Sequence, residues 1–250
     1  MPATPAWPPQ SAVRLFVEET LSSDTMLTIG GAQAHYLLNV MRMKAGTVLK
    51  LFDDMTGEWA AEVVATAKRD ITLSITDHLR QREPVPDLWL GAAPIRRARF
   101  DFLAEKACEL GVARFTPVLT RRAVVDKVKP ERLRAQMIEA AEQCGRTALP
   151  ELDPETKIAD WIAMLDDRTL FFADEEGGAD AAASFTAHPG PAAILIGPEG
   201  GFDAEERARV RAHPRAIAIN LGPRILRAET AAIAATAAWM AVAGDWRTTP

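Results

Sequence analysis

Hydrophobic and polar residues alternate along short segments of the first third of the chain. Ile71, Leu73 and Ile75 alternate with three Ser or Thr residues, which is the period of a half-buried strand. Similar short segments are separated by turn signals, of which 53–57 is the clearest, and one brief helix is expected at 32–41. Several short strands with one helix predict a small β-barrel over residues 11–80. The other expected strands are 14–17, 47–52 and 59–65.

The pattern changes after a proline-containing segment at 81–87, which is the predicted linker because proline removes backbone donors and disfavours helix before it. From residue 88 onward, short apolar runs alternate with longer amphipathic segments. This alternation predicts an α/β domain at 88–250, with a mostly parallel sheet and helices on both faces. The expected strands are 88–93, 115–119, 170–173, 192–196 and 216–221, and the expected helices are 99–110, 130–145, 204–212 and 230–242.

The chain has no segment that predicts export, membrane insertion or a metal centre. Residues 1–10 are rich in proline and predict a disordered tail, because a signal peptide needs a basic region followed by an apolar core. The longest uncharged run, 230–244, is too short to span a bilayer and predicts a buried helix. Two cysteines, Cys108 and Cys144, and four scattered histidines predict reduced thiols in a cytoplasmic protein without a metal.

The charge is distributed unevenly along the chain. The net charge is −5, but residues 81–150 carry 13 basic and 9 acidic groups, whereas residues 151–250 carry 9 and 16. The basic residues of the middle segment include clusters at 96–99 and 121–122. A local basic patch can hold phosphates on an acidic protein, because salt confines the field to roughly 10 Å. The alternative interpretation is a set of solvated surface charges.

Two glycine-containing loops follow predicted strands and are expected to hold a ligand. Loop 197–202 follows one strand and loop 222–230 follows the next, and ligands of open α/β sheets bind beyond the carboxyl ends of strands. Neither loop has the pattern of a phosphate-binding or dinucleotide-binding motif. Asp203 and Glu206 form a predicted capping box that occupies the positive end of the next helix. A phosphate-free, cationic ligand such as S-adenosylmethionine therefore fits better.

These loops also carry a family resemblance. Residues 195–202 and 221–231 resemble the two signature motifs of the ribosomal RNA small subunit methyltransferase E (RsmE) family of the SPOUT superfamily. Residues 105–112 and 141–146 are similar to further family segments. At the N-terminus, 14–17 and 35–42 are similar to the family's RNA-binding barrel of PUA type, so the resemblance covers nearly the whole chain.

The resemblance implies a fold, a cofactor and a reaction. It implies a SPOUT domain with a deep trefoil knot, a PUA-like barrel, and a homodimer with the site at its interface. It also implies methyl transfer from S-adenosyl-L-methionine to N3 of a uridine in 16S ribosomal RNA of the small ribosomal subunit, with no membrane or metal involved. The residues expected to bind the cofactor are Leu195, Ile196, Gly197, Glu199, Gly200, Gly201, Leu221, Gly222, Ile225, Leu226, Arg227, Thr230 and Ala231.

The implied reaction calls for a cation near the base and a group that accepts its N3 proton. Uridine N3 lies on the Watson–Crick edge, so the base must be unpaired and its proton must leave. A cation near the uracil oxygens would stabilise the developing anion, and a carboxylate would accept the proton. Arg227, Glu199 and Arg122 are the expected catalytic residues, with Arg224, Glu229 and Glu142 as alternatives. Each is equally compatible with a helix-capping or ion-pair role.

Affinity for RNA is expected from phosphate contacts in both domains. Arg121 and Arg122 lie outside both ligand loops, so their neutralisation is expected to weaken RNA binding and leave cofactor binding intact. The expected RNA-binding residues are Arg14, Phe16, His35, Arg42, Arg96, Arg97, Arg121 and Arg122.

The sequence departs from the family pattern at two places, and other functions stay open. Arg96-Arg97-Ala98 stands where the family has Lys-Gly-Asp, and Ala123 stands where it has a serine. Roles that need lysine geometry or that hydroxyl are therefore in doubt. The alternatives are a non-catalytic ribosome-assembly factor, which a cofactor-binding titration would identify, and a SPOUT methyltransferase that modifies the ribose 2′-OH or another base.

Overall fold

The computed structural model describes residues 7–9, 12–123 and 127–247, and the chain forms two compact units. Unit 1 comprises Met1–Pro84 and Glu142–Ala148, and unit 2 comprises Val85–Ala141 and Leu149–Pro250. The first division falls inside the expected linker. The short segment 142–148 belongs with the N-terminal unit, which no pattern in the sequence predicted. The expected tail at 1–10 lies mostly outside the described residues.

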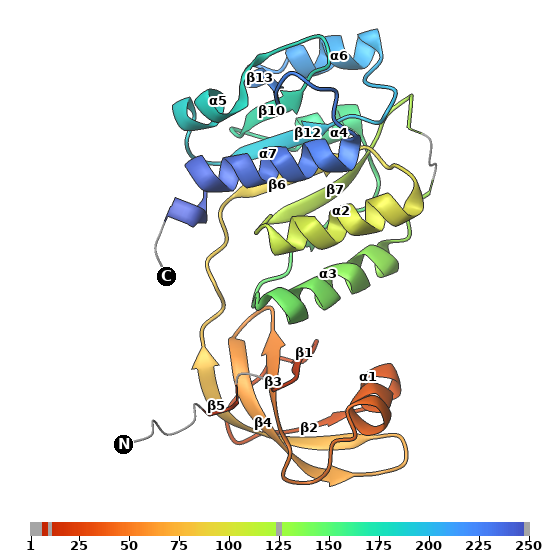
Figure 1. Ribbon diagram of the computed structural model, residues 1–250, viewed down its shortest axis with the longest axis vertical. Helices are drawn as coiled ribbons and strands as arrows, with labels where there is room; N and C mark the ends of the chain where they lie inside the picture. The colour runs from red at the N-terminus through yellow and green to blue at the C-terminus, as the bar shows by residue number, and fades with distance from the viewer. Residues whose placement is uncertain (1–6, 10–11, 124–126, 248–250) are drawn as a thin grey trace. The chain divides into compact units, whose positions relative to one another are not determined.

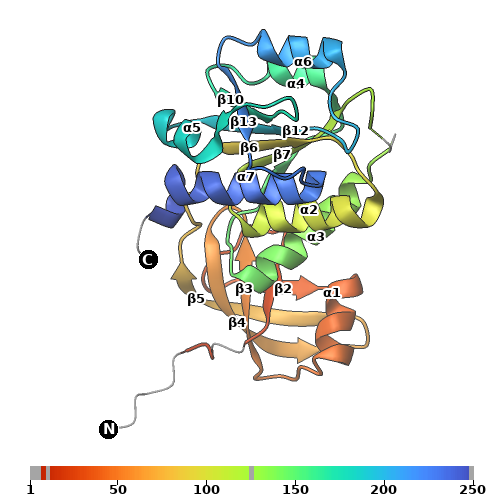
Figure 2. The same cartoon turned by 45° about the horizontal axis from the view of Figure 1, so that its top comes forward.

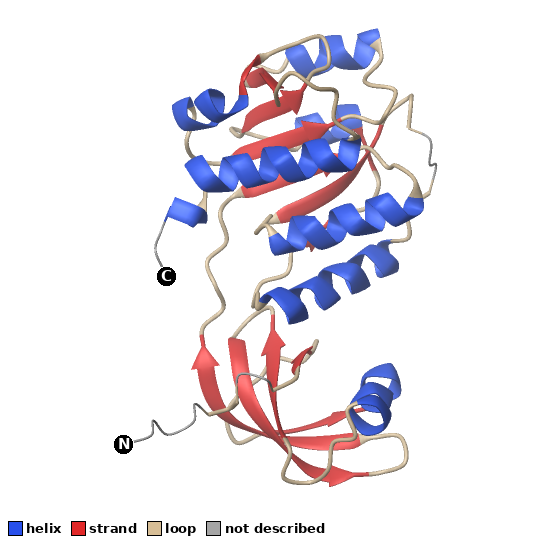
Figure 3. Cartoon of the chain, viewed as in Figure 1, coloured by secondary structure: helices blue, strands red, loops and turns tan. Residues whose placement is uncertain are grey.

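Unit 1 is built on a curled five-stranded sheet with one short helical segment (Figure 3). All four expected strands are present, and the one at 71–76 extends to Arg80. The structure adds an edge strand, β2, that the sequence analysis missed. Because β1 and β2 are the two edges of the sheet, its strand pairing does not close into the ring of a complete barrel. The sheet order is β1 (Arg14–Phe16), β3 (Val48–Asp53), β4 (Gly57–Thr66), β5 (Ile71–Arg80) and β2 (Met26–Ile29), and α1 (Gly31–His35) continues into a π-helical turn at Tyr36–Val40.

The predicted turn between β3 and β4 is organised by one buried carboxylate. Asp53 is 1% exposed and accepts hydrogen bonds from the amides of Leu21 at 2.7 Å and Met55 at 2.9 Å, and from the Thr56 hydroxyl at 2.7 Å. Burial disfavours the charge of Asp53, but these hydrogen bonds outweigh it and lower the pKa of the carboxyl. The turn signal in the sequence is thus confirmed as an Asx-type turn.

A second buried carboxylate, Glu58, joins three parts of unit 1. It accepts from Arg14 Nε at 2.5 Å and from Arg80 Nε at 3.0 Å. Arg14 also donates to the backbone carbonyls of Glu142 and Arg146, both at 2.9 Å, and so ties segment 142–148 to the sheet. These bonds use the Arg14 side chain inside the unit, so the structure does not support its expected role as a phosphate contact.

Phe16 is likewise a packing residue. It is 3% exposed, and its ring meets the Phe52 ring edge-on with centroids 5.5 Å apart. The ring packs inside unit 1, so the structure gives no support to the expectation that Phe16 contacts RNA.

Unit 2 contains an eight-stranded sheet in which every pair of strands is parallel, as the alternation of strands and helices predicted. Its central strands are apolar and buried on both faces, which is typical of a parallel sheet covered by helices. The order is β11 (Ala179–Asp180), β13 (Ala216–Asn220), β10 (Thr169–Ala173), β12 (Ala192–Ile196), β6 (Leu88–Ala92), β7 (Arg114–Leu119) and β8 (Glu151–Leu152), and β9 (Thr156–Lys157) pairs with β7.

Helices cover both faces of this sheet (Figures 1 and 2). Helices α2, α5 and α7 pack together on one face, and α4 and α6 lie on the other. The short helices α4 and α5 were missed by the sequence analysis, because six or seven residues show too little of the helical period. The bounds are α2 (Arg97–Glu109), α3 (Pro130–Cys144), α4 (Ile158–Ala163), α5 (Ala181–Ala187), α6 (Ala204–Arg211) and α7 (Ala228–Val242), followed by a 3₁₀ turn at Asp245–Arg247.

The cysteines differ in environment. Cys108 is buried in α2 and donates to the Met137 carbonyl at 3.2 Å, whereas Cys144 is exposed. In the part of the chain that the structure describes, no helix is long and apolar enough to cross a membrane. Among the same residues, no three His, Cys, Asp or Glu side chains gather in a way that could hold a metal ion.

We expect Glu58→Gln to lower the free energy of unfolding of unit 1 by about 3 kcal/mol at neutral pH, because it leaves Arg14 without its charge partner. Burial disfavours the charge of Glu58, but Arg80 and Arg14 outweigh it and lower its pKa. The stabilisation is therefore present at neutral pH and is lost as the pH falls below roughly 4.

Urea unfolding of wild type and variant at neutral and acid pH measures this difference. The matched control is Glu62→Gln, a half-buried position on the same strand. A Glu58→Gln deficit that stays constant across the pH range would contradict the ionic explanation.

Candidate functional site

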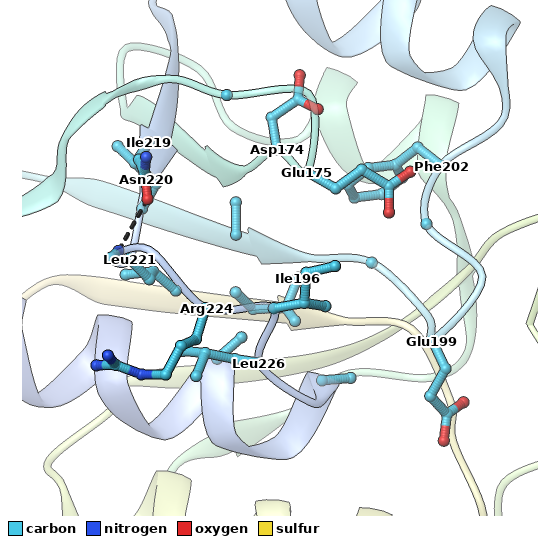
Figure 4. Close-up of a pocket in the computed structure, with 18 of the residues that line it drawn as sticks. Asp174, Glu175, Ile196, Glu199, Phe202, Ile219, Asn220, Leu221, Arg224 and Leu226 are labelled. Atoms are coloured by element: carbon cyan, nitrogen blue, oxygen red, sulfur yellow. Dashed lines mark hydrogen bonds between the residues drawn. The ribbon is translucent and has the colours of Figure 1, made fainter.

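Three loops of unit 2 line one pocket of about 350 Å³ (Figure 4). They follow β10, β12 and β13, which are neighbours in the sheet and run parallel. The carboxyl ends of parallel neighbours meet at the same edge, so the loops that leave them converge. The volume lies within the range of small-molecule sites.

Nine of the thirteen expected cofactor-binding residues line this pocket. Of the other four, Leu195 is fully buried in β12, Gly200 faces Arg122, and Arg227 and Thr230 are exposed at the start of α7. The nine lining residues are Ile196, Gly197, Glu199, Gly201, Leu221, Gly222, Ile225, Leu226 and Ala231.

The third loop was missed by the sequence analysis. It follows β10 and contributes Asp174, Glu175 and Gly177 to the lining. Figure 4 shows Asp174 and Glu175 on the opposite side of Ile196 from Arg224 and Leu226. The signal was present in the sequence, since an acidic, glycine-containing turn directly follows a predicted strand.

An ionic network connects the β10 loop to α6. Asp174 has no exposed side-chain surface and lies 3.2 Å from Arg207 Nε and 2.7 Å from Arg211. Arg207 also lies 3.0 Å from Glu175 and 2.5 Å from Glu176. Because Arg207 is itself only 12% exposed, α6 holds both carboxylates of the pocket wall in place.

The ionisable side chains of the lining are mostly acidic. They are Asp174, Glu175 and Glu199, with Arg224 as the only base. The capping box predicted for α6 is present, with Asp203 accepting from the Glu206 amide at 2.8 Å and Glu206 accepting from the Asp203 amide at 3.2 Å. The hydrogen bond from the Glu206 amide is the main reason that the pKa of Asp203 lies below its usual value. Arginines outside the lining pair with all three carboxylates, and the single base of the lining offers no cradle for a phosphate.

Gly201 shapes the pocket through a neighbouring side chain. Its φ of +67° lies in the left-handed region, and a Cβ at this position would collide with the Glu175 carboxylate. A larger residue would thus act first on Glu175, and only through it on the space for a ligand.

Arg99 bridges two carboxylates beside the pocket. Its guanidinium lies 3.5 Å from Glu199 and 3.6 Å from Glu229. One oxygen of Glu229 is buried without a hydrogen-bond partner among the described residues. The first turn of α2 is thereby linked to the first ligand loop.

Arg121 and Arg122 contact the first ligand loop and the start of α6, so the structure gives no support to the expectation that their neutralisation leaves cofactor binding intact. Arg122 donates to the Gly200 carbonyl at 2.9 Å. Arg121 pairs with Asp203 at 2.9 Å and Glu205 at 2.5 Å. Replacing both residues would therefore remove contacts to the first ligand loop and to the start of α6.

The remaining expected site residues fall into two groups. Glu142 accepts from the Phe16 amide at 3.0 Å within unit 1, which makes a structural role the direct explanation. By contrast, His35 and Arg42 are exposed beside the π-helical turn of unit 1, and Arg96 and Arg97 are exposed at the start of α2.

Comparisons with known proteins find two family models along the chain. A family model described as an RNA methyltransferase domain matches residues 81–240, and a model described as an RNA methyltransferase PUA domain matches residues 29–76. Ribosomal RNA small subunit methyltransferase E of Rickettsia conorii is 28% identical, over 90% of this chain and 93% of its own length.

Two solved structures share the fold over nearly the full length. A methyltransferase from Legionella pneumophila in complex with its cofactor SAM is 27% identical, with a TM-score of 0.85, over 93% of this chain and 98% of its own. Ribosomal RNA small subunit methyltransferase E from Neisseria gonorrhoeae, bound to S-adenosyl methionine, is 25% identical, with a TM-score of 0.85. The match covers 94% of this chain and 99% of that one.

We expect Arg207→Ala to lower the free energy of unfolding of unit 2 by about 3 kcal/mol, because it removes a nearly buried partner of the buried Asp174. Arg211→Ala is the matched control, since its side chain is 49% exposed and contacts the same carboxylate. Denaturant unfolding measures both changes. Equal losses for the two variants would contradict the role of burial.

Proposed function

Because this chain belongs to the RNA methyltransferase family, we propose that it transfers a methyl group from S-adenosylmethionine to N3 of a uridine in 16S ribosomal RNA. The observation that carries the proposal is the pocket at the carboxyl ends of β10, β12 and β13, which is lined by most of the residues of the two family-like loops. The resemblance to the RsmE family supplies the target atom, and the relatives' name supplies the small-subunit RNA.

The pocket suits this cofactor in size, charge and backbone. Its lining has one basic side chain, Arg224, and no lysine, so it offers no phosphate cradle, and S-adenosylmethionine carries no phosphate. Gly197, Gly201 and Gly222 expose backbone groups at the pocket, and Gly222 has its φ at +107° with no atom near its missing Cβ. When bound, S-adenosylmethionine supplies the electrophilic methyl group.

The chain's own residues align the base and manage its charge. Arg227, exposed at the N-terminus of α7, is the cation that stabilises the uracil anion. Glu199 lines the pocket with a third of its side chain exposed, and its carboxylate accepts the N3 proton. Arg122 holds the loop that carries Glu199, through the Gly200 carbonyl, and is a positioning residue.

RNA is recognised by both units. Unit 1 exposes two rings and two basic side chains around the π-helical turn: His35, Tyr36, Arg42 and Lys44. The rings can stack on bases, and the charges can bind phosphates. In unit 2, Arg96 and Arg97 add exposed charge at the start of α2, beside Arg99. These residues bind the small ribosomal subunit in the cytoplasm.

The active form is a homodimer, and the family resemblance also implies the trefoil knot in unit 2. The exposed large apolar side chains of this unit include Phe102 at 43%, Trp246 at 54% and Ile225 at 99%. Ile225 belongs to the second ligand loop, so a partner that covers it would complete the wall of the pocket.

The proposed reaction predicts N3-methyluridine in 16S RNA after assembled small subunits are incubated with the protein and S-adenosylmethionine. Mass spectrometry of the nucleosides measures the product, and subunits incubated without the cofactor are the control. A methyl group on ribose, or on a base other than uracil, would disprove the assigned target. Cofactor binding without any methylated product would favour the assembly-factor alternative.

We expect Gly201→Val to weaken S-adenosylmethionine binding by about tenfold or more, because it displaces Glu175 and strains a left-handed backbone position. Calorimetric titration measures the affinity. Gly190→Val is the matched control, since Gly190 also has positive φ, at +109°, but lies outside the pocket lining. Similar losses in both variants would show that strain alone is responsible.

The proposed dimer predicts that light scattering at micromolar concentration gives twice the chain mass. Ile225→Asp should shift the protein toward the monomer, because it places a charge in an apolar contact. Met164→Asp, at an exposed apolar residue that ends α4, should leave the mass unchanged. A fully active wild-type monomer would rule the dimer out.

A further inference from the structure

Unit 2 contains a second pocket, separate from the one at the strand ends. It has a volume of about 230 Å³ and lies between the first turns of α2 and α3 and the segment before α3. Figures 1 and 2 both show α2 and α3 side by side on the same side of the sheet. The volume is below the range of sites for whole drug-sized ligands, so the pocket suits a smaller group such as a single ring system. Its lining residues are Ile95, Arg97, Phe100, Asp101, Lys127, Val128, Lys129, Arg132 and Leu133.

The floor of this pocket is apolar and its surroundings are basic. Ile95, Phe100 and Leu133 are at most 3% exposed and present hydrocarbon and aromatic surface. The side chains of Arg97, Lys127, Lys129 and Arg132 supply four positive charges, against the one carboxylate of Asp101. An apolar floor with a cationic rim suits a ligand that joins a flat ring to an anion.

Asp101 provides a directional acceptor in this lining. The residue is 6% exposed, and one carboxylate oxygen accepts from Arg132 at 2.6 and 2.8 Å. Burial raises the pKa of the Asp101 carboxyl, and the nearby charge of Arg97 acts in the opposite direction. Because Asp101 lines the pocket, a hydrogen-bond donor on the ligand would meet an acceptor there.

The second pocket is linked to the first through one turn of helix. Arg97 lines the second pocket, and Arg99, two residues later, pairs with Glu199 of the first. A strand of RNA whose target base is at the first pocket would therefore have a neighbouring nucleotide near the second.

We propose that this second pocket binds a nucleotide close to the target uridine, with its base on the apolar floor, its phosphate on the basic rim and an amino group of the base donating to Asp101. The inference rests on the proposed function only for the identity of the RNA. The acceptor favours adenine, cytosine or guanine over uracil, because uracil has no exocyclic amino group and can donate only through its ring N3–H. The pocket thereby contributes to the choice of the methylated site.

Nucleotide binding by the wild-type protein tests this assignment without any methyl transfer. The probes are AMP, CMP, GMP, UMP and inorganic phosphate, and the readout is the NMR shift of the methyl groups of Ile95, Val128 and Leu133. At least one amino-bearing nucleotide should shift these signals and bind about threefold or more tighter than UMP. The same shifts with phosphate alone, equal binding of UMP, or no shift with any nucleotide would overturn the proposal.

Kinetics with small subunits then test whether the pocket serves the reaction. Val128→Trp fills the half-buried side of the pocket without changing charge, and should raise the KM for the RNA substrate about tenfold. The affinity for S-adenosylmethionine should not change. Ala135→Trp, on an exposed face of α3 outside the pocket, is the control and should leave this KM as in wild type.

These two experiments separate the outcomes. Nucleotide binding with no methylated product would end the proposed function and keep the pocket assignment. A methylated product with an unchanged KM for Val128→Trp would end the pocket's role in substrate choice and keep the proposed function. Thermal unfolding of both Trp variants identifies a loss that comes from misfolding.

Discussion

The parallel alignment of three neighbouring strands is the constraint on which the site depends. β10 pairs with β12 on one side and with β13 on the other, so the loops that leave them emerge at the same edge of the sheet. Residues distant in sequence, such as Glu175, Glu199 and Arg224, thereby line one pocket. The strands are fixed by apolar burial, which needs no ligand, so the site is largely formed before anything binds.

The sequence predicted the parts of the site that glycine and proline mark, and missed those that depend on long-range pairing. The loops at 197–202 and 222–230 combine positive-φ glycines with apolar strands, and both signals are local. The β10 loop is acidic and resembles an ordinary solvated turn; its position depends on Arg207, more than thirty residues later. The allocation of 142–148 to unit 1 depends on Arg14, whose acceptors lie more than 120 residues away. No local pattern contains that information.

Basic residues that cluster in a sequence are not all available to bind nucleic acid. Arg14, Arg122 and Arg207 all donate to groups within the protein, and each fixes a backbone segment or a carboxylate. Arg97 and Arg227 are exposed and stay available to a substrate. The difference follows from the neighbours that the fold supplies, because a guanidinium beside a buried carboxylate or carbonyl is held there by several donors at once.

The discontinuity of unit 1 has a consequence for how the chain is made. Ribosomes synthesise proteins from the N-terminus, and domains generally fold as they emerge. Here the sheet of unit 1 is complete by Arg80, but the carbonyls that accept from Arg14 lie at the end of α3. Arg14 must therefore remain without these acceptors until the first two strands and two helices of unit 2, β6, α2, β7 and α3, have been translated. Unit 1 thus completes its contacts only after the first elements of unit 2 have been synthesised. The folding of the two units is therefore coupled during translation.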